Sequence, residues 1–229
     1  LTPLRTSRDF RIIMGAGLIT FLGSMVTYVA LPFQVKEITG SYVAVGLLGA
    51  IEIVPLVIFG LYGGTLADAI DRKKMIVIME VASLVLTTIL LINSLLPQPK
   101  LWVLYIVAGI FAAVDGLARP SLDAMIPRIL PHDQMMAASA LRSVRWQFGA
   151  VLGPVIGGIL ITWKGVHAAF IFDVITYAVS ILLLIRLAPS PAEHDSPAPS
   201  LSSLLEGVRY AMSRKDLMGT YAVDLAAMF

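Results

Sequence analysis

Six long runs of apolar residues constrain the fold of this chain more than any other feature of its sequence. A helix needs about 20 apolar residues to cross the hydrocarbon core of a bilayer. Strands of a membrane barrel would alternate apolar and polar side chains, and these runs do not alternate. We therefore predict an all-α membrane protein. Its six spans are expected at Ile12–Pro32, Tyr42–Ala67, Met75–Leu96, Leu101–Ala118, Met135–Trp163 and Val166–Leu187.

Composition agrees with a membrane protein. The mean hydropathy is +0.86 and 14% of the residues are charged, whereas about a quarter are charged in soluble proteins. The chain has no cysteine, which excludes disulfides and cysteine–metal sites and fits a bacterial inner (plasma) membrane protein. The three histidines, His132, His167 and His194, are far apart in the sequence and form no metal-binding motif. We expect no metal and no cofactor.

The basic residues predict the orientation of the spans. With the N-terminus in the cytoplasm, 14 of the 17 Lys and Arg fall on the cytoplasmic side, where such residues are enriched. Only Lys36, Lys100 and Lys164 fall on the outer side. The run that begins at Ile12 is too long for the apolar core of a signal peptide, and no small-residue cleavage site follows it. We therefore expect a retained first span in a multi-pass protein.

The chain divides into three parts. Residues 1–188 form the predicted six-span bundle. Residues 189–215 are expected to be a cytoplasmic linker that is rich in Pro and Ser and is followed by an amphipathic helix. Residues 216–229 begin a seventh span, which the chain cuts off at Phe229. The chain begins with Leu1, so we also expect that it has been trimmed at its start.

A dense cluster of charges, GGTLADAIDRKK, separates the second and third runs at residues 63–74. We predict a tight cytoplasmic turn, in which Gly63 and Gly64 let the backbone turn or pack closely. The three basic residues at its end hold the loop in the cytoplasm. Topology alone explains those three residues, but it does not explain the spacing of Gly64, Asp68 and Arg72.

That spacing resembles the signature loop of the major facilitator superfamily, which also lies between the second and third spans. The matching positions are Gly64, Leu66, Ala67, Asp68, Arg72 and Lys73. Two positions differ, because Ala69 stands where the family often has Arg and Asp71 where it often has Gly. In the family this loop holds the two halves together on the cytoplasmic side, so the resemblance implies a gate formed by Asp68 and Arg72.

A second motif lies in the fifth predicted span, in GAVLGPVIGG (residues 149–158). Gly149, Gly153 and Gly157 repeat every four residues and so form one smooth stripe along a helix, which permits close helix packing. Pro154 removes a backbone hydrogen bond and can kink the span. Together with Gly158, this pattern resembles the antiporter motif of exporters in the superfamily. Generic packing of small residues is the alternative explanation.

The resemblance covers essentially the whole chain and is strongest to the branch that holds drug–proton antiporters, macrolide efflux proteins and the enterobactin exporter. It implies a proton-coupled antiporter that moves small amphiphilic molecules, such as drugs or siderophores, out of the cell by alternating access. Members of the family typically have twelve spans. The chain is therefore expected to be an N-terminal half whose partner is the missing C-terminal half of the same protein.

Several charged residues are predicted to lie within the spans, where a charge costs about 2.5–3.5 kcal/mol and needs a reason. The candidates for coupling or substrate contact are Glu52, Asp115, Arg142 and Arg145. Glu52 lies mid-span and is a candidate proton carrier or a structural partner, and Asp115 is better suited to structure and gating. Arg142 and Arg145 share a helical face with Gly149 and are candidates for binding an anionic group or for pairing with Glu52 or Asp115.

Two further acids are expected near the ends of their spans, Glu80 at the interface and Asp173 at an outer gate or in contact with water. Two other function classes stay open. One is a transporter of a different substrate, such as a lysophospholipid flippase or a nutrient importer. The other is a membrane sensor or enzyme, although no nucleophile elbow or phosphate loop supports it. The basic residues are spread over the membrane loops, so we expect no nucleic-acid partner and no enzymatic activity.

Overall fold

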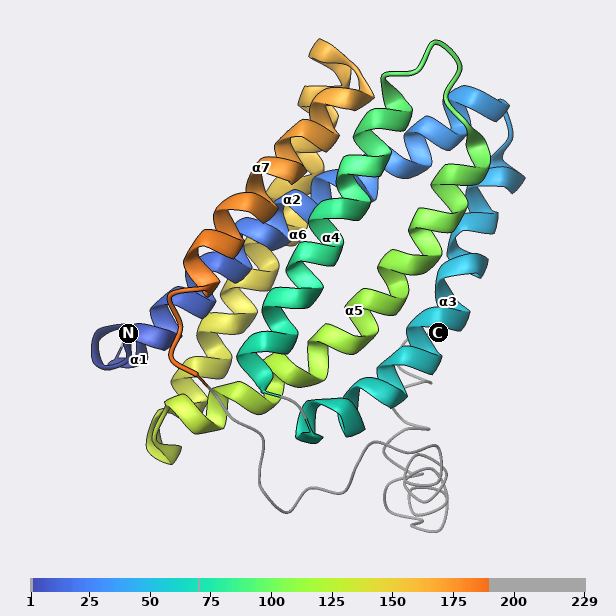
Figure 1. Ribbon diagram of the computed structural model, residues 1–229. Helices are drawn as coiled ribbons and strands as arrows, with labels where there is room; N and C mark the ends of the chain where they lie inside the picture. The colour runs from blue at the N-terminus through green and yellow to red at the C-terminus, as the bar shows by residue number, and fades with distance from the viewer. Residues whose placement is uncertain (1, 70, 190–229) are drawn as a thin grey trace, which may run out of the picture.

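Six long helices lie side by side in the computed structural model of the protein (Figure 1). It describes residues 2–69 and 71–189, except for the side chains of residues 61–69, 119–121 and 123–124. All six helices are long and apolar enough to cross a membrane, which confirms the predicted all-α membrane fold. A short helix, α1 (Thr2–Thr6), and a 3-10 turn, η1 (His132–Gln134), accompany them. The six are α2 (Arg8–Thr39), α3 (Tyr42–Ala69), α4 (Arg72–Ser94), α5 (Leu101–Ile129), α6 (Met135–Lys164) and α7 (Val166–Leu184).

Local sequence signals set the ends of these helices. The side chain of Ser7 accepts a hydrogen bond from the backbone N–H of Phe10 and caps the start of α2, as a serine at this position commonly does. Gly40 ends the same helix in the left-handed conformation, with φ 66°, which a residue without a β-carbon adopts without strain. Asp71 caps α4 by accepting a hydrogen bond from the N–H of Lys74.

The predicted turn at Gly63 is wrong in its position. Helix α3 continues through Gly63 and Gly64 to Ala69, and α4 begins at Arg72, so the connection is shorter than the sequence indicated. Leu66, Ala67 and Ala69 favour the helix. Two other helices are longer than their predicted spans: α2 runs from Arg8 to Thr39, and α5 continues beyond Ala118 to Ile129.

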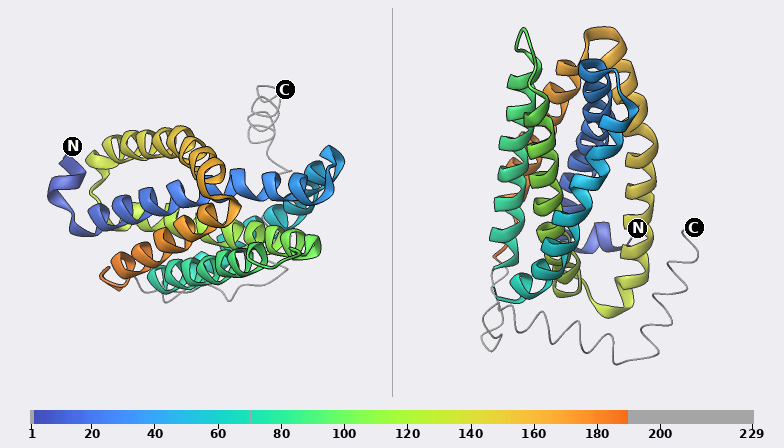
Figure 2. Two further views of the ribbon diagram at one scale, coloured as in Figure 1. Left: turned by 90° about the horizontal axis from the view of Figure 1, so that it is seen from above. Right: turned by 90° about the vertical axis from the view of Figure 1, so that its right-hand side faces the viewer.

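The six helices pack in a definite order. The most extensive contacts are those of α3 with α5, followed by those of α2 with α7 and with α6, while α4 joins α7 to α5. The view from above shows α2 between α6 on one side and α7 on the other (Figure 2, left). Helix α2 therefore contributes two opposite faces to the interior.

The glycine stripe of α6 forms the contact with α2. A β-carbon added at Gly149 would collide with the ring of Phe21, and one at Gly153 would collide with the side chain of Met25. At Gly157 the nearest atoms are the backbone Cα and O of Val26, both 3.3 Å from the position of such a carbon. The predicted close packing is therefore present. Gly158 has open space beside it and lies outside the stripe.

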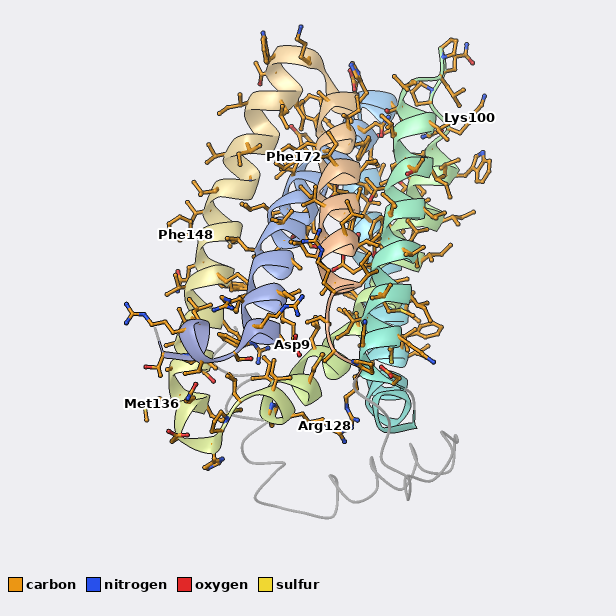
Figure 3. The ribbon with its side chains drawn as sticks, turned by 60° about the vertical axis from the view of Figure 1, so that its left-hand side comes forward. Asp9, Lys100, Arg128, Met136, Phe148 and Phe172 are labelled. Carbon is orange, nitrogen blue, oxygen red and sulfur yellow. The ribbon has the colours of Figure 1, made fainter. Side chains whose placement is uncertain are left out.

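We name the two ends of the bundle after Asp71 and Lys100. The Asp71 end holds the start of α2, the α3–α4 connection and η1, and the Lys100 end holds Gly40, Lys100 and Gly165. Asp9 and Arg128 lie at the first end and Lys100 at the other (Figure 3). The linker and amphipathic helix predicted for residues 189–215, and the seventh span predicted for residues 216–229, lie outside the described residues apart from residue 189.

We predict that Gly153→Ala lowers the stability of the folded protein by roughly 1–3 kcal/mol, as inserting a carbon into a packed interface does. The cause is the collision with Met25 and the neighbouring carbonyl of Leu22. Thermal unfolding of the detergent-solubilised protein measures the effect. Gly158→Ala is the matched control, because its β-carbon meets no atom within 4 Å. Equal unfolding temperatures for the two variants would contradict the proposed role of the stripe.

Candidate functional site

Arg145 lies on the face of α6 that meets α2. A β-carbon on Gly17 of α2 would collide with its guanidinium group, and the arginine itself is half-buried. Gly149, one turn further along α6, packs against Phe21 of the same helix. Arg145 and Gly149 therefore share the face that the sequence predicted, and this face is directed at α2. Arg142 is also half-buried.

The acids Glu52 and Asp115 lie on the paired helices α3 and α5. Glu52 is half-buried. Its neighbour Ile51 packs against Gly109 of α5, with a methyl carbon 3.3 Å from the position of an added β-carbon. Asp115 is exposed on α5, next to Gly116, which approaches the backbone of α3 closely. The structure thus places both candidates on the α3–α5 pair.

The α3–α4 connection is only partly described. The side chain of Asp68 lies outside the described residues, so the Asp68–Arg72 gate stays a prediction. Arg72 itself is buried at the start of α4, with 3% of its surface exposed. Lys73 donates hydrogen bonds to the backbone carbonyls of Ile185, at 2.9 Å, and Leu187, at 2.5 Å.

The Lys73 contact has a clear physical purpose. The last carbonyls of a helix have no partner within the helix, and the helix dipole favours a cation beside them. Lys73 satisfies two carbonyls just after the end of α7 and ties that end to the start of α4. Sequence reasoning assigned Lys73 to topology and motif, and it missed this role because the partners are more than 100 residues away in the chain.

A polar seam runs through the interface of α2, α4 and α7. At its Lys100 end, Asp173 is fully buried and accepts a hydrogen bond from Thr27 of α2, at 2.5 Å, while the hydroxyl of Thr87 of α4 lies 3.3 Å from the same carboxyl oxygen. Thr176 lies 3.1 Å from the other carboxyl oxygen. A β-carbon on Gly23 would collide with Asp173 and Thr176, so the glycine makes room for these polar groups.

The seam continues toward the Asp71 end. The hydroxyls of Ser24 and Tyr177 are 3.0 Å apart. Nearer the Asp71 end, the hydroxyl of Thr20 donates to the carboxyl group of Glu80 and lies 3.2 Å from each carboxyl oxygen. The three helices contribute matching sets of residues: Thr20, Ser24 and Thr27 from α2, Glu80, Ser83 and Thr87 from α4, and Asp173, Thr176, Tyr177 and Ser180 from α7.

The polar seam corrects one expectation from the sequence, because Asp173 is fully buried and not in contact with water. Glu80 is half-buried and accepts a hydrogen bond from Thr20 of α2. The signal was present in the spacing of Asp173, Thr176, Tyr177 and Ser180, which places four polar groups on one helical face. The partner faces on α2 and α4 carry the same spacing, but the sequence does not show which helices pair.

Comparisons with known proteins agree with this architecture. The enterobactin exporter EntS of Shigella boydii is 30% identical over 221 residues, which cover 93% of this chain and 51% of the exporter. The enterobactin exporter EntS of Escherichia coli is 29% identical over the same coverage. A solved structure of the peptide transporter POT in complex with alafosfalin matches 94% of this chain and 46% of that protein, with a TM-score of 0.57 and 14% identity.

The fold is that of one half of a major facilitator membrane transporter, a class of proteins that are not enzymes. Residues 1–226 match the profile of one family within this class. The chain belongs to that family, the transmembrane secretion effectors. It spans about half the length of the curated relatives it matches.

We predict that Lys73→Ala loosens the end of α7, because two backbone carbonyls lose their partner. The local opening free energy should fall by about 1 kcal/mol for the lost charged hydrogen bonds at this partly exposed site, which corresponds to roughly fivefold faster amide exchange. Hydrogen–deuterium exchange of residues 181–187 measures the change. Lys74→Ala is the matched control, because Lys74 is exposed. Equal exchange in the two variants would refute the capping role.

Proposed function

We propose that the full-length protein is a proton-coupled exporter of small amphiphilic molecules, such as drugs or siderophores. The six described spans form one half of the transporter, and alternating access rocks this half against the other around a site at the midplane. The observation that carries the proposal is the alignment of 93% of the chain with enterobactin exporters, about half of whose length it spans. The same alignment favours siderophores within the proposed substrate class.

We further propose that the Asp71 end faces the cytoplasm of a bacterium and that the protein lies in the inner membrane. The start of α2 and the start of α4 both lie at this end, and both carry several basic residues. The Lys100 end carries few, namely Lys36, Lys100 and Lys164. An excess of basic residues marks the cytoplasmic side of a membrane protein.

The site residues take the following roles in this proposal. Asp68 and Arg72 form the cytoplasmic gate together with Gly64 and Lys73. Arg142 and Arg145 bind an anionic group or orient an acid, which the position of Arg145 inside the bundle supports. Coupling involves Glu52 or Asp115, and an unchanged pH dependence of transport in Glu52→Gln would exclude Glu52. Protons and the substrate are then the small partners of the protein.

Two other functions are weighed against this one. A lysophospholipid flippase or a nutrient importer would have the same fold, because the fold does not fix the substrate. A membrane sensor or enzyme would need a further soluble domain beyond the spans. Export is favoured because the relatives named above are exporters.

The first experiment measures accumulation of dyes, macrolides and siderophores in efflux-deficient cells that express the full-length gene. We expect lower accumulation of at least one compound, and we expect a protonophore to restore it, because the proton gradient drives the export. Cells with the empty vector are the control. Unchanged accumulation of every compound would contradict the proposal and favour lipid or nutrient transport, whereas export that resists the protonophore would contradict the proton coupling alone.

The gate is tested by Asp68→Asn in the full-length transporter. We expect export to fall severalfold, because the variant keeps the size of the side chain and removes the charge that pairs with Arg72 in the proposed gate. Asp71→Asn is the matched control, since it removes one charge from the same connection and asparagine caps a helix about as well as aspartate. The two variants should express equally. Equal export rates would rule out a specific role for Asp68.

A further inference from the structure

The partners of Asp173 are unusual for a buried carboxylate. Its side chain is fully buried and contacts only hydroxyl groups, those of Thr27, Thr87 and Thr176. Among the described side chains, which leave out residues 61–69, 119–121 and 123–124, no Lys, Arg or His forms an ion pair with it. An ionised carboxylate in such a place loses its hydration and gains no compensating charge, and buried groups of this kind become neutral.

The described groups that face Asp173 from the neighbouring helices also provide no positive charge. Helix α2 contributes only hydroxyls, and α4 contributes Glu80, whose negative charge would repel that of Asp173. Helix α7 adds the hydroxyl of Tyr177. The arginines of α6 lie toward the Asp71 end, where Arg145 contacts Gly17. The titratable neighbours of Asp173 among the described side chains are therefore an acid, Glu80, and a phenol, Tyr177.

The hydroxyl hydrogens near Asp173 are too few to satisfy every acceptor around them. A hydroxyl has one hydrogen to donate. The hydroxyl of Thr87 is 3.0 Å from the backbone carbonyl of Ser83 and 3.3 Å from Asp173. The hydroxyl of Thr176 is 2.7 Å from the backbone carbonyl of Asp173 and 3.1 Å from its carboxyl oxygen. Both hydroxyls thus have a nearer acceptor than the carboxyl group.

Only Thr27 then has a hydrogen that is directed at Asp173 without competition among the described residues, at 2.5 Å. If the Thr87 and Thr176 hydroxyls donate to their nearer carbonyls, a further hydrogen bond to the carboxyl group needs a hydrogen from Asp173 itself. A protonated carboxyl group supplies one, which the oxygen of either Thr87 or Thr176 can accept. If Asp173 were ionised, only Thr27 among the described residues would donate an uncontested hydrogen bond to it, and no described cation would offset its charge.

We propose that Asp173 is an occluded proton-binding site that holds a proton in this conformation of the protein. Proton loss leaves a carboxylate, which needs water or a cation, so release requires α7 to separate from α2 and α4. The inference does not rest on the proposed function, since it follows from contacts within one conformation. If the protein is a proton-coupled exporter, Asp173 joins Glu52 as a candidate carrier.

Infrared spectroscopy of the purified full-length transporter tests the proposal at neutral pH. The wild-type spectrum minus that of Asp173→Asn should contain the carbonyl stretching band of a protonated carboxylic acid. The asparagine keeps a donor and an acceptor for the threonines, so we expect this variant to fold. Glu37→Gln is the matched control, because Glu37 is exposed and its difference spectrum should contain carboxylate bands. Carboxylate bands in the Asp173→Asn difference would overturn the proposal.

A second variant keeps the test decisive if Asp173→Asn does not fold. Thr27→Val removes the shortest hydrogen bond to the carboxyl group of Asp173 and leaves the acid in place. With aspartate labelled by ¹³C at its side-chain carboxyl carbon, the variant should shift a protonated carboxylic acid band of the labelled protein. A shift confined to carboxylate bands would overturn the proposal. Glu80→Gln should leave the Asp173 band in place, and its disappearance in this variant would assign the proton to Glu80 instead.

Discussion

Close contact of α2 with α6 on one side and with α7 on the other joins three of the six described spans. Lipid tails are as apolar as the side chains, so burial of apolar surface does not drive helices together within a membrane. Packing and hydrogen bonds are what remain. Helix α2 uses packing against the glycine stripe of α6, where Gly157 approaches the backbone of Val26. It uses hydrogen bonds toward α7, where Thr27 contacts Asp173.

These two contacts have different consequences for motion. The glycine contact depends on shape, so it resists separation in any protonation state. The hydrogen bonds of the polar seam depend on whether Asp173 is protonated, so a change of its charge would alter the packing of α2, α4 and α7. The proposed proton site thus lies between helices of the described bundle and not on its surface. A further contact, the hydrogen bond from Lys73 to the carbonyl of Leu187, ties the start of α4 to the segment just after α7.

Some features of the structure follow from the sequence and others do not. The six spans were predicted correctly because apolar length alone decides which segments can cross a bilayer. Gly149, Gly153 and Gly157 were placed on one face because the helical repeat fixes it. The turn at Gly63 was misplaced because glycines mark a possible turn without requiring one. Asp173 was misjudged because its position along the span does not reveal its neighbours.

The sequence by itself determined the all-α membrane fold, the number and approximate bounds of the six described spans and the stripe along α6, because these depend on local periodicity and on the thickness of a membrane. Only the tertiary structure decided which helices pair, that Asp173 and Glu80 share one polar seam, and that Lys73 reaches Leu187. Those facts join residues that lie 60 to 146 positions apart. A one-dimensional pattern records which face of a helix is polar, but the partner of that face is chosen by the packing of the whole bundle.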